Sequence, residues 1–409
     1  MMGGKVMAHQ RDELQAERLR LDKAGSRVWL VSGIVGLLGL AVAGFLATST
    51  PNGRSDFFHS YLANFMYFLS LSLGGLFFVL IMRLTRAGWS VTIRRLAEVV
   101  AWAVVPLAVL AVVILFGMHD LYEWSHAEVV AHDDLLQKKQ AWLDPTFFAI
   151  RLAVYFLVWG LLATYFLRQS CKQDESGDPS LTTRMEAVAA PGMILYALTV
   201  TFAAFDLLMS LTPHWYSTIY GVYYFAGCIL GFFALAPVLI AMLKRRGFLT
   251  RLITPEHSHD LGKLMFGFVV FWAYIAFSQY LLIWYGNLPE ETVWYSAREQ
   301  GVWVWISVLL LFGHFLLPFL MLMSRYPKRK AATLVIGAVW LLIMHWIDVF
   351  YLVMPNVRTE GSPFRLMDLA CLVGIGGLFL AFVMWRLGRT NLIPVNDPRL
   401  DEALSFENA

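Results

Sequence analysis

The sequence alternates between long apolar stretches and short polar segments. About ten of the apolar stretches approach the roughly 20 residues that an α-helix needs to cross the hydrocarbon core of a bilayer. Backbone polar groups in hydrocarbon must be hydrogen-bonded within their own segment, so these stretches are expected to be transmembrane helices. The predicted spans are residues 27–47, 60–83, 95–117, 146–168, 187–211, 217–243, 262–286, 301–324, 331–354 and 366–386.

The composition agrees with a membrane protein. Hydrophobic residues make up 58% of the chain and charged residues 15%, well below the roughly 25% that is usual in soluble proteins. A net charge of +3 gives no indication of nucleic-acid binding. The three cysteines, Cys171, Cys228 and Cys371, form no CxxC or CxxCH motif, so the sequence indicates no disulfide, no cysteine-bound metal cluster and no covalently attached haem.

Most Lys and Arg residues lie at alternate helix ends. If residues 1–26, a charged segment without the features of a signal peptide, face the cytoplasm, the basic loops are also cytoplasmic. The tail, residues 387–409, is then cytoplasmic too. The chain is therefore expected to cross its membrane several times, with both of these segments on the cytoplasmic side.

A repeated phrase indicates internal duplication. Asp206 and Asp348 each lie seven residues before a proline, Pro213 or Pro355, in spans that run outward. In addition, YFLSLSLGGLFFVLI in the second span resembles YFAGCILGFFALAPVLI in the sixth. We therefore expect an all-α polytopic protein with two four-helix bundles arranged as parallel repeats. The expected units are peripheral helices at 27–47 and 366–386, and bundles at 60–211 and 217–354.

Charged residues at membrane depth are expensive and should face the protein interior. Arg151 and Asp206 lie at similar depth near the outer side, which predicts an ion pair between adjacent helices. This pair is either a structural link or a carboxylate that handles protons or contacts quinol. His345 and Asp348 share one helical face with Tyr351, and form either a proton relay or a hydrogen-bonded part of the core.

Other polar residues suggest steps of a proton path. Glu98, Glu186 and Lys263 lie about one turn inside the inner helix ends, where they either pair near lipid headgroups or form the mouth of a cytoplasmic half-channel. Further polar residues could connect the two sides of the membrane or simply hydrogen-bond between helices. These central residues are Tyr274, Ser278, Gln279, Tyr280 and His314.

The histidines suggest two possible cofactor sites. The outer loop at 119–145 contains three histidines and two tryptophans, and we expect a docking surface for an extrinsic partner there in preference to a metal site. Haem b would need His314 and His345 at matching depth, whereas residue counts place them about 20 Å and about 13 Å from the outer surface. Haem ligation is therefore disfavoured.

The phrases FDLLMSLTPHWYSTIYGVYYFAG (205–227) and FWAYIAFSQYLLIWYGNLPEETVWY (271–295) carry a family resemblance. They resemble membrane subunits of the NrfD/polysulfide-reductase type, and among these the F-type subunits of bacterial alternative complex III. The resemblance extends from the first span to the last. It implies ten helices in two four-helix bundles and no cofactor in the chain itself.

The resemblance also implies a function. Such subunits belong to a quinol:cytochrome c, or other high-potential acceptor, oxidoreductase of respiratory or photosynthetic electron transport, with quinol or menaquinol as substrate. The implied partners are a homologous NrfD-type subunit, an iron–sulfur subunit, multihaem cytochrome c subunits, lipids and, as a further candidate, a terminal oxidase. The sister subunit is the one implied to oxidise quinol, so no catalytic residue is assigned in this chain, and proton conduction is left open.

Two other functions fit the same pattern of spans. A secondary transporter would also use repeated bundles, usually with helices broken at corresponding places in both halves. Several helices here contain prolines, namely Pro106, Pro191, Pro237 and Pro318, but without clear correspondence. A haem-b membrane anchor is the third possibility.

Overall fold

The computed structural model describes residues 17–21, 23–358 and 361–408. Most of the predicted N-terminal surface segment, residues 1–16, lies outside these ranges. In the described part, ten helices are long and apolar enough to cross a membrane. The prediction of an all-α polytopic membrane protein is therefore confirmed.

The first bundle is formed by four successive spans that pack as a closed ring. They are α3 (Gly53–Leu84), α4 (Val91–Trp102) continued by α5 (Val104–Phe116), α9 (Pro145–Ser176) and α10 (Ser180–Leu207). Each span contacts the next, and α10 returns to α3. Proline at the first turn and the Asp144 side chain, which accepts from the backbone N–H of Phe147, start α9.

The second bundle repeats this arrangement. Its spans are α11 (Tyr220–Arg245), α12 (Pro255–Gly286), a composite third span, and α17 (Ala331–Val353). The composite span consists of α14 (Trp303–Leu309), the π-helical segment η4 (Leu310–Leu316) and α15 (Leu317–Met323). A π-helical turn inside a helix is uncommon and is frequently found at functional sites.

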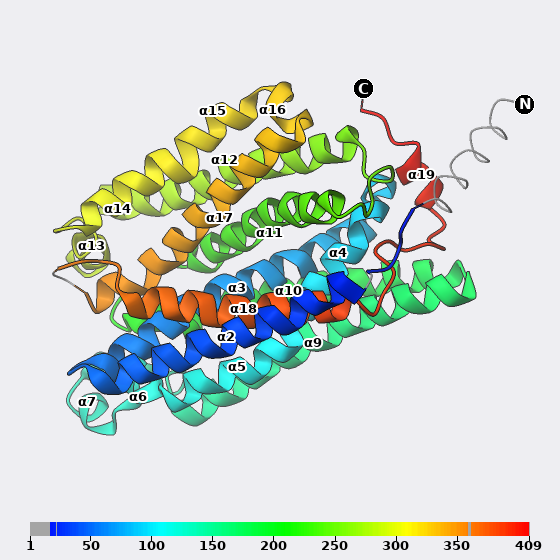
Figure 1. Cartoon of the computed structure of the whole chain (residues 1–409). Helices are drawn as coiled ribbons and strands as arrows, with labels where there is room; N and C mark the ends of the chain where they lie inside the picture. The colour runs from blue at the N-terminus through cyan, green and yellow to red at the C-terminus, as the bar shows by residue number, and fades with distance from the viewer. Residues whose placement is uncertain (1–16, 22, 359–360, 409) are drawn as a thin grey trace, which may run out of the picture.

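The two bundles meet along α3 and α11, and the hydroxyl of Tyr224 donates to the carbonyl of Met66 across this seam (2.8 Å). The backbones approach closely, since a Cβ added at Gly74 would lie 2.1 Å from the Cys228 carbonyl oxygen. Figure 1 shows α3 and α11 side by side in the centre of the molecule. The close packing of α3 on α11 therefore joins the two bundles directly.

Two peripheral helices, α2 (Lys23–Ser49) and α18 (Leu366–Leu387), lie against each other outside the bundles (Figure 1). A Cβ at Gly36 would lie 2.8 Å from the carbonyl oxygen of Gly374, and one at Gly377 would lie 2.6 Å from the backbone nitrogen of Gly36. Small residues permit such backbone-to-backbone packing in membranes, where helix association depends on close van der Waals contact.

Short helices cover both ends of the bundles. At the end where the C-terminal tail lies, here called the basic end, they are η1 (Gly88–Ser90), α16 (Arg325–Arg329) and α19 (Leu400–Leu404). At the opposite end, the far end, they are α6 (Met118–Leu121), η2 (Glu123–Ser125), α7 (Ala127–Ala131), α8 (Asp134–Lys139), η3 (Met209–Leu211), α13 (Pro289–Ser296) and η5 (Met354–Asn356).

Helix α3 begins earlier than the predicted start at residue 60. Its first turns contain the polar residues Asp56 and Ser60. Arg358 forms ion pairs with Asp56 (3.0 Å) and with Asp368 of α18 (2.7 Å), and Ser60 also donates to Asp368 (2.5 Å). These contacts with distant residues satisfy the polar side chains and allow the helix to extend.

Candidate functional site: two buried carboxylates

The predicted Arg151–Asp206 ion pair is present in the first bundle. Nε of Arg151 donates to one carboxylate oxygen of Asp206 (2.8 Å), and an Nη donates to the other (2.9 Å). Trp142 and Tyr155 also donate to this carboxylate, at 2.9 and 2.7 Å. Both charged side chains are buried. The carboxylate is thus neutralised and accepts four hydrogen bonds, an arrangement typical of a structural link.

Aromatic rings enclose the same arginine. The guanidinium carbon of Arg151 lies 4.1 Å from the ring centroid of Trp142 and 4.3 Å from that of Phe147. Such cation–π contacts add to the stability of a desolvated guanidinium. Arg151 is therefore fixed between α9, α10 and the loop that precedes α9.

The loop at 117–144 closes the far end of the first bundle. Trp124 is buried, and its indole nitrogen donates to the carbonyl of Ser210 (3.1 Å). The hydroxyl of Tyr122 donates to the carbonyl of Leu207 (3.1 Å), and Lys139 donates to that of Pro213 (2.6 Å). Trp124 and Trp142 thus anchor this loop to the bundle, although the sequence placed them on the surface. The docking role of the loop stays a prediction.

The histidines of this loop contact other residues of the same loop. The rings of His119 and His126 lie 5.0 Å apart, and His132 bonds to the carbonyl of Glu128 (2.8 Å). Within the described ranges, no three His, Cys, Asp or Glu side chains are grouped so that they could hold a metal ion.

Asp348 of α17 lies in a different environment, in the second bundle. One carboxylate oxygen accepts a hydrogen bond from the hydroxyl of Tyr223, and the other accepts one from the indole nitrogen of Trp272 (3.0 Å). The side chain is buried, yet none of the described Lys or Arg residues pairs with it. An ionised carboxylate buried without a counter-charge is costly.

Two imidazoles lie next to this carboxylate. His345 is buried between α17 and α3, with Nε2 at 2.7 Å from the Ser70 hydroxyl, while its Nδ1 has no hydrogen-bond partner in the described part of the chain. His314 is also buried, and neither of its ring nitrogens has a described partner. Its ring stacks on Trp272 with 4.0 Å between centroids, and its centroid lies 6.4 Å from that of His345.

The local fold explains how these rings fit. His314 lies inside the π-helical segment, where the irregular turn directs it toward the bundle interior. His345 packs on two glycines of α11, since a Cβ at Gly227 or at Gly231 would lie 2.8 Å from its ring. The histidines are thus neighbours, although residue counts had separated them in depth. Ser70 contacts one nitrogen of His345, and Trp272 covers one face of the His314 ring, so the disfavoured haem ligation stays a prediction.

His345 and Asp348 share a face, as predicted, but they form no direct hydrogen bond. A Cβ at Gly227 would lie 2.8 Å from Cε1 of His345 and 3.9 Å from a carboxylate oxygen of Asp348, so both border the same space. We name Asp348, Tyr223, Trp272, His345 and His314 the Asp348 cluster.

A buried arginine of the second bundle lies apart from this cluster. Arg298 precedes α14, is fully buried, and donates to the carbonyls of Trp294 (3.0 Å) and Leu352 (3.1 Å). Burial lowers the pKa of Arg298 to about 10. Its guanidinium carbon lies 3.4 Å from the ring centroid of Trp294 and 5.4 Å from that of Tyr351.

Tyrosines lie between Arg298 and Asp348. Tyr220 interacts electrostatically with both charged groups, and its hydroxyl has no hydrogen-bond partner among described residues. Tyr351, which the sequence grouped with Asp348, bonds instead to the hydroxyl of Ser307 (2.7 Å) and packs beside Arg298. The second bundle therefore keeps its buried cation and carboxylate separate.

The predicted central residues of α12 divide into two groups. Gln279 is buried, accepts from Ser217 (3.0 Å) and donates to the Tyr295 hydroxyl (3.1 Å), so it links α12 to the far end. Tyr274 is 64% exposed on the outer face of the described structure, and Tyr280 is 37% exposed. The buried face of α12 contains Trp272 and Gln279, whereas Tyr274 lies on the opposite, exposed face, and its role on a proton path stays a prediction.

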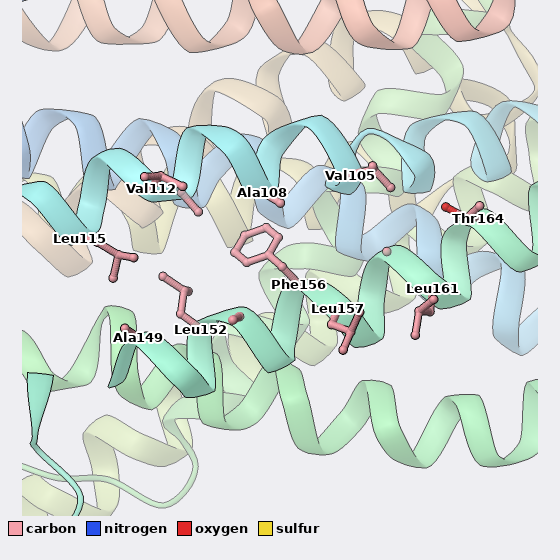
Figure 2. Close-up of a pocket in the computed structure, with 13 residues that line it drawn as sticks. Val105, Ala108, Val112, Leu115, Ala149, Leu152, Phe156, Leu157, Leu161 and Thr164 are labelled. Carbon is pink, nitrogen blue, oxygen red and sulfur yellow. The ribbon is translucent and has the colours of Figure 1, made fainter. Parts of the chain in front are cut away.

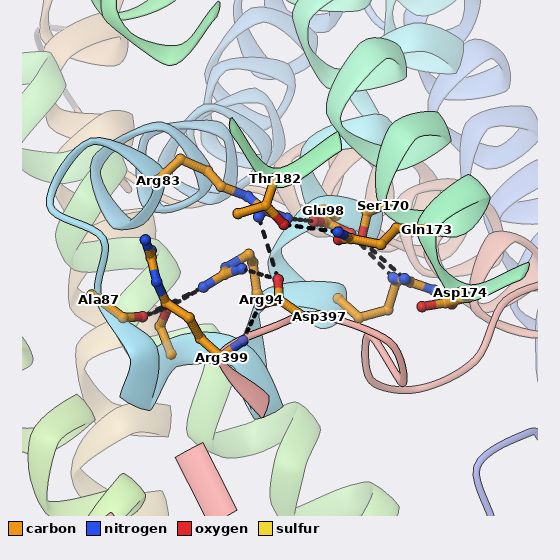
Figure 3. A network of polar contacts seen from close by, with 12 residues as sticks. Arg83, Ala87, Arg94, Glu98, Ser170, Gln173, Asp174, Thr182, Asp397 and Arg399 are labelled. Carbon is orange, nitrogen blue, oxygen red and sulfur yellow. Dashed lines mark hydrogen bonds and ion pairs between the residues drawn. The ribbon is translucent and has the colours of Figure 1, made fainter. Parts of the chain in front are cut away.

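At the basic end, the predicted polar residues are all engaged in ion pairs. Arg83 (3.6 Å) and Arg95 (3.1 Å) pair with Glu98. Figure 3 shows Arg83 and Glu98 within this network. Arg86 (3.2 Å) and Arg399 (2.9 Å) pair with Glu186. Lys263 pairs with Asp260 and donates to Asn408 (2.7 Å). The pairing alternative thus describes these residues, while a channel role stays untested.

The C-terminal tail contributes to this network, which the sequence did not indicate. Asp397 forms ion pairs with Arg94 (2.7 Å) and Arg83 (3.3 Å) (Figure 3). Burial raises the pKa of Asp397, but Arg94 and Arg83 outweigh this effect and hold it below its usual range. The tail therefore closes the basic end of the first bundle.

Sequence reasoning identified Asp348, His345 and His314 but missed Tyr223, Trp272, Tyr220 and Arg298. Tyr223 and Trp272 lie within the two phrases that carry the family resemblance, which was the available signal. Comparison of the chain with protein-family models and with curated proteins finds no match.

Proposed function

We propose that this chain is an integral membrane subunit of a quinol:electron-acceptor oxidoreductase of the alternative complex III type, and that the Asp348 cluster exchanges protons. The family assignment is supported by the two long phrases at 205–227 and 271–295 and by the paired four-helix bundles. The proton function is supported by one observation above all: a buried carboxylate without a cation, bonded to a tyrosine hydroxyl.

The chemistry of the cluster suits proton exchange. The Tyr223 hydroxyl can donate to or accept from Asp348, and imidazoles are the side chains that most readily gain and lose protons near neutral pH. The free ring nitrogens of His345 and His314 provide positions for a proton on the side away from Tyr223. Tyr220 and Arg298 are the next polar side chains between Asp348 and the far end.

Glu98 and Glu186 have a different role in this proposal. Each pairs with two arginines, and the tail covers them. We assign them to stability of the basic end, so the proton enters the second bundle by another route.

The proposal includes the location and partners implied by the family. The chain lies in a bacterial cytoplasmic membrane with its basic end in the cytoplasm, beside a homologous membrane subunit. Quinol or menaquinol is the substrate of the complex. Iron–sulfur clusters and haem c belong to extrinsic partner subunits at the far end.

The arrangement of irregular helices supports a complex subunit over a transporter. In the first bundle, the helix break at Ala103 lies in the second span, between α4 and α5. In the second bundle, the π-helical segment lies in the third span. Transporter halves usually break corresponding helices.

The assignment is tested by mild purification through a tag on this chain. We expect cytochrome c and iron–sulfur subunits in mass spectrometry and a c-type signal in the reduced-minus-oxidised spectrum. Isolation of the chain alone, without either partner, would contradict the oxidoreductase assignment.

The proton function is tested with two adjacent tyrosines of α11. Tyr223→Phe removes the donor to Asp348, whereas Tyr224→Phe removes a donor to a backbone carbonyl at the seam. In vesicles energised with quinol, we expect a lower proton-to-electron ratio for Tyr223→Phe and an unchanged ratio for Tyr224→Phe. Equal ratios for both variants and for Asp348→Asn would show that the cluster is structural.

A further inference from the structure

An apolar groove runs along the lipid-facing side of the first bundle, between α5 and α9. Its volume is about 540 Å³, and Figure 2 shows Val105, Ala108 and Val112 on one wall and Phe156 and Leu157 on the other. The groove exists because several of the residues that line it on the two helices are small. Gly160 is one of them, and a Cβ added there would meet only Val105, at 3.7 Å.

Three arginines lie at the basic end of this groove. Arg168 follows the lining residue Thr164 by one turn of α9. Arg386, near the end of α18, lies with its guanidinium carbon 5.0 Å from the ring centroid of Trp102, and Arg389 lies 3.7 Å from that of Trp385. The two tryptophans stack on each other, with centroids 5.7 Å apart. Tryptophan and arginine together are typical of the membrane–water interface.

The charge of these arginines is not balanced by the protein. Across residues 17–21, 23–358 and 361–408, no carboxylate forms an ion pair with any of the three, although Arg83, Arg94 and Arg95 nearby are all paired. Arg168 and Arg389 are close enough to Arg386 to repel its guanidinium. The Nε of Arg386 is buried and has no hydrogen-bond partner in the described structure. Arg168 and Arg389 are exposed and Arg386 is half-buried, so an anion that reaches this cluster can neutralise all three.

The groove leads directly to the arginines. Val105 follows Trp102 by one turn, and Thr164 precedes Arg168 by one turn, so each wall of the groove ends at the cluster. An apolar channel that ends at unpaired arginines matches a molecule with a hydrocarbon chain and an anionic head. Basic pockets between transmembrane helices bind lipid headgroups of this charge.

We propose that the α5–α9 groove and Arg168, Arg386 and Arg389 form a binding site for one anionic phospholipid. The acyl chain fills the groove, and the phosphate binds the guanidinium groups. This site is independent of the Asp348 cluster and of the oxidoreductase assignment.

The test compares two sets of arginine variants of the full chain, purified with its partners. The site variant is Arg168→Gln/Arg386→Gln/Arg389→Gln. The control variant, Arg184→Gln/Arg245→Gln/Arg246→Gln, removes the same charge from exposed positions at the same end. Delipidated samples are titrated with cardiolipin or phosphatidylglycerol, with phosphatidylcholine as the neutral lipid, and bound lipid is counted by native mass spectrometry.

We expect each site arginine removed to weaken retention of anionic lipid about fivefold, because each basic residue near the membrane surface adds a similar increment of binding. The control variant should retain the lipid. Equal loss in both variants, or equal retention of phosphatidylcholine by the unaltered chain, would overturn the proposal.

A second variant tests the groove separately. Gly160→Leu fills the groove without a clash at Cβ, and should reduce diacyl lipid while leaving inorganic phosphate binding unchanged. If Gly160→Leu displaces quinone and no phospholipid, the occupant is an isoprenoid tail and the lipid proposal is wrong.

Discussion

The two bundles hold their buried carboxylates in opposite ways. In the first, the Asp206 carboxylate accepts hydrogen bonds from two guanidinium nitrogens of Arg151 and from two aromatic side chains. In the second, Asp348 has a tyrosine and a tryptophan as donors, while the buried arginine lies elsewhere. Both aspartates occur in the same sequence context, seven residues before a proline. Context alone therefore does not determine the electrostatic environment.

The difference follows from the position of one arginine. Arg151 lies inside α9, one and a half turns from its first residue Pro145, and so reaches the depth of Asp206. Arg298 precedes α14, which begins at Trp303, and is held by backbone carbonyls near the far end. One bundle thus contains a closed ion pair, and the other contains separated charges with tyrosines between them.

The largest expected effect breaks the closed pair. Arg151→Met leaves the Asp206 carboxylate buried without a cation and should cost about 3–5 kcal/mol of unfolding free energy. Arg298→Met removes no carboxylate partner and should cost less, about 1–3 kcal/mol from unsatisfied carbonyls. Thermal unfolding in detergent measures both. The double variant Arg151→Met/Asp206→Leu should recover most of the loss, and equal costs for the two arginine variants would refute the comparison.

The second prediction exchanges each carboxylate for an amide. Asp206→Asn removes the charge that balances Arg151 and should cost about 3 kcal/mol or more. Asp348→Asn leaves an acceptor for one of its two donors and loses no counter-charge, so about 1 kcal/mol is expected. The two variants are compared by chemical or thermal unfolding under identical conditions. A larger loss for Asp348→Asn would mean that an unseen cation balances Asp348.

The third prediction concerns the glycines beneath His345. Gly231→Ala places a Cβ 2.8 Å from the imidazole and 2.9 Å from Leu71, so the ring must move, at a cost of about 1–3 kcal/mol. Gly44→Ala is the matched control, because no atom lies within 4 Å of its added Cβ. It should be neutral or slightly stabilising in a helix. Equal stability of the two variants would show that His345 is loosely held.

The smallest effect concerns Asp397, a carboxylate neutralised by arginines as Asp206 is. Because its pKa in the folded chain is below the usual value of about 4, the ionised group stabilises the tail above that pH. This stabilisation should be lost as the pH falls below about 4, toward the pKa of the folded state. Protection of the tail from proteolysis, measured against pH, should show this loss for the unaltered chain and not for Asp397→Asn. Asp401→Asn, at an exposed position, should behave like the unaltered chain.

The depth of residues in the predicted spans correctly predicted the ion pair of the first bundle. In the predicted spans 146–168 and 187–211, Arg151 and Asp206 lie at similar depth on the same side, and in hydrocarbon two such charges have few alternatives to pairing. The orientation of α12 could not be predicted in this way. A transmembrane helix is apolar on the lipid side and on the protein side, so hydrophobicity does not distinguish the face of Tyr274 from that of Trp272.

The sequence by itself determined the fold class, the number of spans and the residues that must be shielded from lipid. Those properties depend on local composition, which the hydrocarbon core constrains strongly. The tertiary structure decided which carboxylate receives a cation, which imidazoles become neighbours and how the tail covers Glu98. These outcomes depend on helix rotation and on contacts between residues far apart in the chain, such as Ser70 with His345 and Arg94 with Asp397.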